Sequence, residues 1–162
     1  MTDGVSDTAD RVMVLSIHPR HVEKILEGSK SVELRRTRPL VGPGQPVAIY
    51  ATLPSGALVA TCRISEIQAG TPPEIWRLVG DATGLTRVEF DEYFEGADSA
   101  VALHLVAVTA LVDEITLEDL RAQGRRFHPP QTWHFFDRQR LVQLTGKHPS
   151  SPALTGLLPA KA

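Results

Sequence analysis

The chain has 162 residues, of which 42% are apolar, and this composition supports one sizeable hydrophobic core. The formal net charge of −2 provides no overall basic field of the kind that attracts nucleic acid, so any anion binding has to be local. The single cysteine, Cys62, excludes an internal disulfide, and no segment approaches the roughly 18 apolar residues of a membrane-spanning helix. We therefore predict a single domain and no membrane partner.

The two ends of the chain are predicted to lie outside the domain. Residues 1–10 are small and polar, show no periodicity and are expected to be disordered. They also lack the basic and apolar regions of a signal peptide, which leads us to expect a cytoplasmic protein. Residues 146–162 are rich in Pro, Ser and Ala, and we expect a mobile tail there. The predicted domain is residues 11–145.

The domain is predicted to begin with a strand and a short helix. Residues 12–17 form an apolar run of strand length, and the following His18 and Pro19 provide a helix start with proline in the first turn. Apolar residues then repeat at helical spacing up to residue 26. Gly28 has the position of a left-handed C-cap, so the helix is expected to end sharply there.

The segment after this helix, residues 28–36, reads G-S-K-S-V-E-L-R-R and places charged residues beside apolar ones. Successive side chains of a strand point to opposite faces, so Glu33 and Arg35 are expected to share one face. Lys30 lies at the strand entrance, where its long side chain is able to reach the same face. The three charged groups are therefore predicted to converge on one cleft. The alternative is an exposed strand with a surface ion pair of little energetic value.

The rest of the chain contains more predicted strand than helix. Strands are predicted over residues 47–52, 57–67 and 99–112. Short helices are predicted over residues 74–79, over residues 87–94 and after Thr116, where capping-box patterns occur. A doubly wound sheet needs a long crossover helix between strands, and none is present. The pattern favours an α+β fold built on a small mixed barrel or curled sheet.

No common cofactor or metal motif occurs in the sequence. We find no phosphate-binding loop, dinucleotide fingerprint, nucleophile elbow or zinc-ligand spacing, so no cofactor and no metal are predicted. Cys62 and His104 each lie in an apolar run, and we expect both to be structural. His18, at the predicted helix start, is also expected to be structural. By contrast, residues 125–138 combine arginines, histidines, prolines and aromatic residues, a mixture that is unusual in a simple connection.

A longer stretch resembles a known family. Residues 15–36, L-S-I-H-P-R-H-V-E-K-I-L-E-G-S-K-S-V-E-L-R-R, resemble the opening of ASCH domains, the activating signal cointegrator homology group of the PUA-like superfamily. The G-x-K-x-x-E-x-R pattern of that group is matched by Gly28, Lys30, Glu33 and Arg35. The resemblance continues through G-L-T-R-V-E-F-D-E-Y-F-E-G-A and P-P-Q, and covers about residues 12–137.

This resemblance implies a PUA-like small β-barrel of five to six mostly antiparallel strands with short flanking helices. It also implies a cleft, lined by the motif, that binds RNA or a nucleotide-like small molecule, and a regulatory role in transcription or translation. Lys30 and Arg35 would donate hydrogen bonds to a phosphate or base carbonyl, and Glu33 would orient them. Tyr50 and Trp133 are candidate stacking platforms, although Trp133 is an equally good core residue. The remaining candidate ligand contacts are Arg36, Arg126 and Gln131, with Arg38 and Arg125 in the same basic set.

Some relatives are enzymes, which provides a rival hypothesis. Small bacterial acetylcytidine amidohydrolases resemble this chain through G-x-K-x-x-T-x-R, with the lysine and threonine taken to be catalytic beside a later glutamate. Here Lys30 matches, but Glu33 stands at the threonine position and Thr83, beside Asp81, stands near that of the glutamate. In an enzyme, Lys30 and Glu33 would be the catalytic pair, acting on a modified nucleoside or cleaving RNA as a ribonuclease. Binding is the first hypothesis and catalysis the second.

Overall fold

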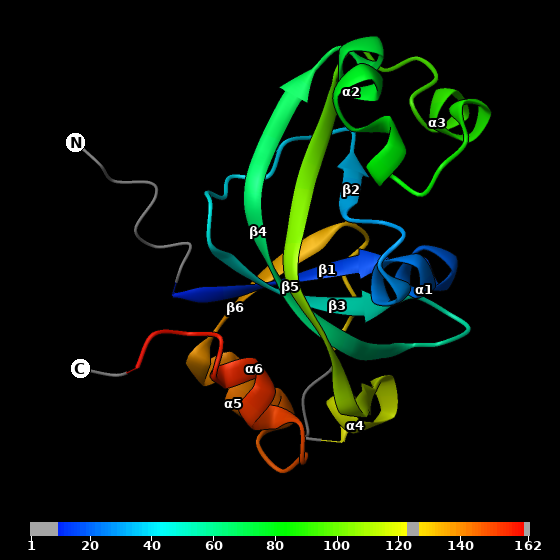
Figure 1. Cartoon of the computed structure of the whole chain (residues 1–162). Helices are drawn as coiled ribbons and strands as arrows, with labels where there is room; N and C mark the ends of the chain where they lie inside the picture. Colours follow the sequence, from blue (N-terminus) through cyan, green and yellow to red (C-terminus); the bar gives the residue numbers. More distant parts are fainter. Residues whose placement is uncertain (1–9, 123–126, 161–162) are drawn as a thin grey trace.

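The computed structural model describes residues 10–122 and 127–160. Six strands form one mixed sheet in the order β2-β5-β4-β3-β1-β6 (Figure 1). They are β1 (Arg11–Ile17), β2 (Val32–Arg35), β3 (Gln45–Ala51), β4 (Ala57–Gly70), β5 (Ala100–Thr116) and β6 (Trp133–Asp137). Only β1 and β3 are parallel among the paired strands described, which confirms a mostly antiparallel α+β fold. Apart from Asp10, the N-terminal segment predicted to be disordered lies outside the described residues.

A long antiparallel ribbon of β4 and β5 runs through the whole molecule and gives the sheet its curl (Figure 1). Its register shifts in several places, and at one of them Ala107 has a positive φ of 54°. Such bulges increase the local twist and bend of a strand. The sheet is therefore curled like a small barrel, but its hydrogen-bonded order ends at β2 on one side and at β6 on the other.

The helices are short, as predicted, with between five and nine residues each. They are α1 (Pro19–Glu27), α2 (Pro72–Val79), α3 (Arg87–Tyr93), α4 (Leu117–Arg121), α5 (Arg138–Thr145) and α6 (Ser151–Thr155), with a 3₁₀ turn η1 (Gly80–Ala82). Within the described part of the chain, no helix is long and apolar enough to cross a bilayer. β6, α5 and α6 had no counterpart in the sequence-based prediction.

Hydrophobic residues on the two faces of β1 belong to different cores. Met13, Leu15 and Ile17 point to the face that α1 covers, whereas Val12 and Val14 point to the face that α4, α5 and α6 cover (Figure 1). A third, smaller core lies where α2 and α3 pack against β2 and the start of β5. The C-terminal end of β1 and the whole of β2 thus lie between the first and third cores, and this is where the charged motif is placed.

The C-terminal segment differs from the mobile tail that we predicted. Leu154 of α6 is completely buried and Leu158 is 7% exposed, both in the core beneath β1 and β3. The hydroxyl groups of Thr145 and Ser151 lie 2.9 Å apart and link α5 to α6. The sequence signal was weak because only a few apolar residues stand among Pro, Ser and Ala. Those few are sufficient, because they cover a sheet face that would otherwise be exposed.

Replacing Leu154 by Ala tests this packing. The change removes a fully buried side chain, so we expect the free energy of unfolding in urea to fall by about 2–5 kcal/mol. Leu40, which is 87% exposed, provides the matched control, and Leu40→Ala should change stability by less than about 0.5 kcal/mol. Equal, small effects of the two substitutions would contradict a packed C-terminal segment.

Candidate functional site

Lys30, Glu33 and Arg35 converge in the structure, as predicted, and we refer to them as the charged triad. The Nζ atom of Lys30 lies 3.4 Å from Oε1 of Glu33, and Nη2 of Arg35 lies 2.9 Å from Oε2 of the same carboxylate. The three residues are only 2%, 7% and 9% exposed, respectively. The alternative of a surface ion pair is therefore wrong, and the triad is a buried network of two cations around one carboxylate.

The position of Lys30 follows from the end of α1 and from a close approach by another loop. Gly28 ends the helix at φ 90°, and the chain turns back so that the Lys30 amide donates to the carbonyl of Lys24 at 3.1 Å. The Lys30 ammonium donates to the carbonyl of Thr83 at 2.8 Å. Gly84 has a φ of 70°, and a side chain there would come within 3.2 Å of Cβ of Lys30. The loop after η1 thus closes over the lysine.

Arg35 is held from the other side by the end of β1. Its Nη2 atom donates to the carbonyl of Ser16 at 2.8 Å. The Ser16 amide donates to the carbonyl of Thr132 at 3.1 Å, and its hydroxyl donates to the carbonyl of Pro130 at 2.6 Å. Gln131, one of the predicted contacts, is exposed between these two anchors. Ser16 therefore places the P-P-Q segment directly beside the triad.

Electrostatics in the triad favours the ionised carboxylate. Burial by itself would raise the pKa of Glu33, but the charges of Arg35 and Lys30 and the hydrogen bonds to the carboxylate hold its pKa below the usual range. Burial lowers the pKa of Lys30, and the carboxylate of Glu33 opposes this effect. Glu33 is therefore a fixed anion, and the buried ammonium of Lys30 loses its proton more readily than that of an exposed lysine.

A cavity of about 240 Å³ opens next to the triad. It is lined by Ser16, Ile17, His18, His21, Lys30, Glu33, Leu34, Arg35, Leu85 and Tyr93. The Tyr93 hydroxyl donates to the carbonyl of Leu34 at 3.2 Å, so the ring of this half-exposed residue is fixed against β2.

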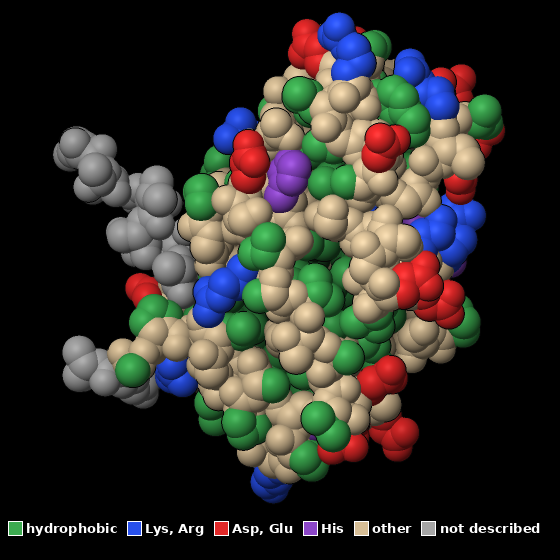
Figure 2. Space-filling model, in the orientation of Figure 1, with side chains coloured by type: hydrophobic (Ala, Val, Ile, Leu, Met, Phe, Trp, Pro, Cys, Tyr) green, Lys and Arg blue, Asp and Glu red, His purple; other side chains and the backbone are tan. Residues whose placement is uncertain are grey.

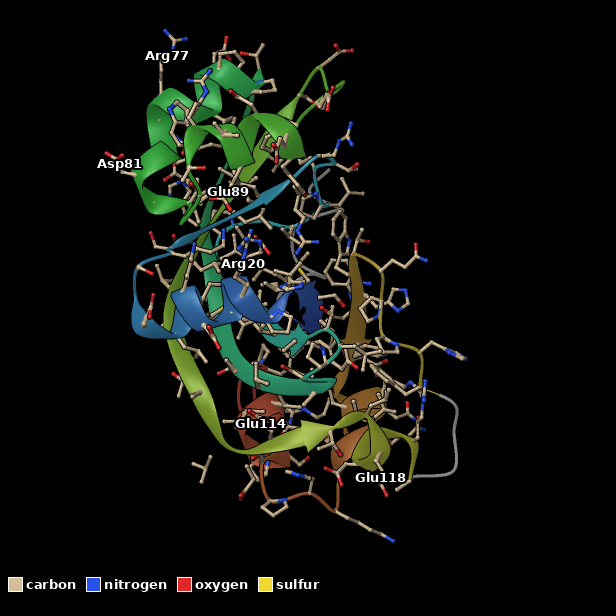
Figure 3. The ribbon with its side chains drawn as sticks, turned by 90° about the vertical axis from the view of Figure 1, so that its right-hand side faces the viewer. Arg20, Arg77, Asp81, Glu89, Glu114 and Glu118 are labelled. Carbon is tan, nitrogen blue, oxygen red and sulfur yellow. The ribbon has the colours of Figure 1, made fainter. Side chains whose placement is uncertain are left out.

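An ion pair of 3.0 Å between Arg20 and Glu89 joins α1 to α3, and Figure 3 shows the two side chains between these helices.

Two polar atoms in the cavity wall have no hydrogen-bond partner among the described residues. They are Nδ1 of His21 and Nε of Arg35, and both are buried. Burial lowers the pKa of His21, and the nearby Lys30 charge lowers it further, which favours the neutral ring. Sequence reasoning missed His21. The available signal was its place three residues after His18 on the first turn of α1, a spacing that puts both rings on one side of the helix.

Comparison with known proteins gives a consistent picture. No family model matches the chain. The ASCH domain-containing ribonuclease of Zymomonas mobilis is 31% identical over 147 residues, which is 88% of this chain and 99% of that protein. The chain belongs to the ASCH domain family. The crystal structure of ASCH from Zymomonas mobilis superposes with a TM-score of 0.77 at 27% identity, covering 84% of this chain and 94% of that one, which confirms the predicted PUA-like fold. A part of this ASCH chain, 98 residues or 60% of it, is also 26% identical to 31% of ribosomal protein uL22 from Ureaplasma parvum.

Other predicted ligand contacts of this ASCH domain occupy different positions. Tyr50 is only 2% exposed and packs against Phe127, with ring centroids 6.4 Å apart, in the core on the far side of β1. Its ring face is not open to a base, so its prediction as a stacking platform was wrong. Trp133 is half-buried on β6, opposite Leu15, and packs on the first core without lining the cavity. Side chains alternate between the two faces of a strand, and this alternation decides which face Tyr50 and Trp133 occupy. The identity of each residue by itself did not reveal that face.

The basic residues near the motif are dispersed in the described part of the ASCH domain. Arg36 is exposed and donates to the carbonyl of Glu95 at 3.3 Å, outside the cavity. Arg38 is also exposed. Arg125 and Arg126 lie outside the described residues. Figure 2 shows basic and acidic side chains interspersed on one face of the molecule, without a single large basic surface.

The enzyme hypothesis placed Thr83 and Asp81 near the position of a catalytic glutamate. Thr83 is fully buried and contributes its backbone carbonyl to Lys30, while its hydroxyl donates to the carbonyl of Gly80 at 2.8 Å. Asp81 is exposed and points away from the domain (Figure 3). Among the described residues, Glu33 is therefore the carboxylate that lines the cavity beside Lys30. The pattern of the amidohydrolases is not reproduced at this site.

Of the three residues predicted to be structural, two lie outside the cavity. The third, His18, lines it, and its Nδ1 atom also accepts from the Arg20 amide at 3.2 Å at the start of α1. Cys62 is buried in the first core, and burial raises the pKa of its thiol to about 12. His104 lies on β5 with its Nε2 atom 2.7 Å from the side-chain oxygen of Gln68. No group of three or more His, Cys, Asp or Glu residues suited to a metal ion occurs in the described ranges.

Substituting Glu33 by Gln tests the energetics of the triad. The amide preserves the shape of the side chain but leaves two buried cations without a counter-charge, so unfolding free energy at pH 7 should fall by about 3 kcal/mol. Glu114→Gln is the matched control, because Glu114 is exposed on β5 (Figure 3) and its change should have little effect. Urea denaturation of the two variants measures the difference.

Comparison of Glu33→Gln with the wild type also tests the pKa of Glu33. Because this pKa is lowered by folding, the contribution of the carboxylate to stability is present above its ordinary value of 4.5 and is lost as pH falls through the lower folded value. The unfolding free energies of the wild type and Glu33→Gln should therefore converge as the pH is reduced below 4.5. A constant difference down to the acid transition would contradict an ionised Glu33.

Proposed function

We propose that this protein binds RNA and that the charged triad forms the contact site. The observation that supports the proposal is the location of the triad in the wall of a cavity. A buried network with two cations and one anion costs solvation energy, and apolar residues of similar size stabilise a fold at least as well. A network placed at a cavity, with a net charge of +1 from Lys30, Glu33 and Arg35, is suited to an anionic or carbonyl-bearing ligand.

The family relationship supports RNA as the ligand. The Zymomonas relative that matches 88% of this chain is named an ASCH domain-containing ribonuclease, and a ribonuclease has to bind RNA. The protein as a whole has a net charge of −2 and no large basic surface on the face shown in Figure 2. We therefore propose recognition of a short RNA segment, with few phosphate contacts, in place of broad electrostatic attraction.

The triad has hydrogen-bonding capacity left for such a ligand. Two of the three ammonium donors of Lys30 are directed at the carbonyl of Thr83 and at Glu33, which leaves one donor. Nε of Arg35 has no partner among the described residues. Glu33 holds both cations in position. The two free donors suit a phosphate oxygen or the carbonyl oxygen of a base.

Removing either cation should weaken RNA binding. For Lys30→Ala and Arg35→Ala we expect at least a tenfold loss of affinity for a short single-stranded RNA, measured by fluorescence anisotropy. The affinity of the wild type should also fall with salt by a slope of only about −1 to −2, reflecting one to three phosphate contacts on a single strand.

Two exposed residues outside the cavity provide matched controls. Lys147→Ala and Arg77→Ala remove a lysine and an arginine side chain, respectively, from exposed positions. Figure 3 shows Arg77 pointing away from the domain. Both controls should bind RNA as the wild type does. Equal affinity of all four variants would show that RNA, if bound, contacts a different surface.

Cleavage of RNA is a second candidate function, and the name of the Zymomonas relative favours it. In such a reaction the 2′-hydroxyl attacks the adjacent phosphorus, a base accepts its proton and an acid protonates the leaving 5′-oxygen. Lys30, whose pKa burial lowers, is the better proton donor at the site. Glu33 is the carboxylate in the cavity wall that would accept the proton of the 2′-hydroxyl, and the two cations that stabilise it make it a weak base.

Cleavage is tested with end-labelled RNA under enzyme excess. If the triad is catalytic, the wild type should cleave RNA but not DNA of the same sequence, which lacks the 2′-hydroxyl, and Lys30→Ala should lose at least 100-fold in rate, the lower range for general acid–base catalysis. Lys147→Ala again serves as the control. RNA binding without cleavage, in both the wild type and the control, would leave the cavity as a recognition site alone.

A further inference from the structure

We propose that the cavity beside the triad receives the hydrogen-bonding edge of a single nucleobase, and that Nε of Arg35 and Nδ1 of His21 bind that edge. This inference rests on the proposed function and specifies which part of the RNA enters the site. It adds His21, which lies on α1 and outside the G-x-K-x-x-E-x-R motif, as a binding residue.

The first argument comes from unpaired polar atoms. Four buried side-chain atoms lack a hydrogen-bond partner in the described part of the chain, and two of them belong to His21 and Arg35, which are residues of this one cavity wall. An unpaired buried donor or acceptor costs about 1–3 kcal/mol, so two at one place indicate a ligand that satisfies them. The Nε–H group of arginine only donates, and its partner on the ligand is an acceptor.

The second argument concerns the charge state of His21. Burial and the neighbouring Lys30 both favour the neutral ring, although Glu33 opposes them. A neutral imidazole has one donor and one acceptor nitrogen, whereas an ionised phosphate oxygen only accepts hydrogen bonds. A site built for phosphate alone would be better served at position 21 by a permanent cation in addition to Lys30 and Arg35. The combination of a guanidinium donor and a neutral imidazole matches an amide edge with adjacent carbonyl and N–H groups, as in uracil or guanine.

The third argument comes from the shape and the remaining walls of the cavity. Leu34, Leu85 and Ile17 contribute apolar surface, and the half-exposed ring of Tyr93 lies at the wall with its hydroxyl bonded to β2. Apolar and aromatic faces are suited to the flat faces of a base. The volume of about 240 Å³ is below the roughly 300 Å³ at which cavities for drug-sized ligands begin, so one base fits the site better than a longer segment.

The experiment compares ligands that share a phosphate but differ in the base. UMP and GMP are titrated into the full-length protein by calorimetry, alongside ribose 5-phosphate, which has no base. We expect both nucleotides to bind at least tenfold tighter than ribose 5-phosphate. In His21→Ala that advantage should be reduced about tenfold, while the weak binding of ribose 5-phosphate should not change.

Two further variants separate recognition from folding. His21→Asn retains a polar side chain able to donate and accept, and it should recover part of the affinity if hydrogen bonding is the cause. His134→Ala is the matched control, because His134 is exposed on β6 opposite Val14 and does not line the cavity. Urea unfolding of each variant confirms that the fold is retained at the titration temperature.

The possible failures are distinguishable. If Lys30→Ala loses RNA binding but UMP, GMP and ribose 5-phosphate bind equally and His21→Ala binds as the wild type does, the nucleobase inference is wrong and the proposed function stands. If the wild type binds neither RNA nor nucleotides, the proposed function is wrong and the inference is overturned with it. A base preference that persists in His21→Ala and is lost in Arg35→Ala would also overturn the role of His21.

Discussion

The burial of Lys30, Glu33 and Arg35 as one network constrains the rest of the site. Two cations can be removed from water here only because one carboxylate and two backbone carbonyls accept their hydrogen bonds, while the Leu34 amide donates to the same carboxylate. Each of these partners comes from a different segment: the end of β1, the loop after η1 and the backbone of β2 itself. The network therefore fixes the relative positions of these segments, and the cavity is the space that remains between them.

This arrangement joins fold and chemistry at a single residue of β1. Ser16 accepts from Arg35 through its carbonyl and holds the segment around Pro130 and Thr132 through its amide and hydroxyl. Two stretches far apart in the sequence, the charged motif and P-P-Q, are thereby brought together at one end of the sheet. Among the described residues, Nε of Arg35 and Nδ1 of His21 have no hydrogen-bond partner, and the proposed ligand would use this remaining capacity.

Sequence reasoning succeeded where the physical signal was local. The exit of α1 at Gly28 was predictable because a left-handed C-cap favours glycine, and the shared face of Glu33 and Arg35 followed from alternation along a strand. Sequence reasoning failed for residues whose packing partners are far away in the sequence. Tyr50 and Trp133 were chosen as aromatic residues near the motif, but the strand face on which each lies decided its environment, and Tyr50 became part of a core.

The sequence by itself determined the family, the order of the main strands, the short capped helices and the motif that carries the charge. Local chemistry is sufficient for these features, because caps, alternation and the G-x-K-x-x-E-x-R spacing each lie within a few residues. Only the tertiary structure decided that the curled sheet keeps β2 and β6 as its edges, that α6 completes a core, and that His21 enters the cavity. These features depend on how separate elements of the chain pack against one another, and the sequence of each element alone does not specify that packing.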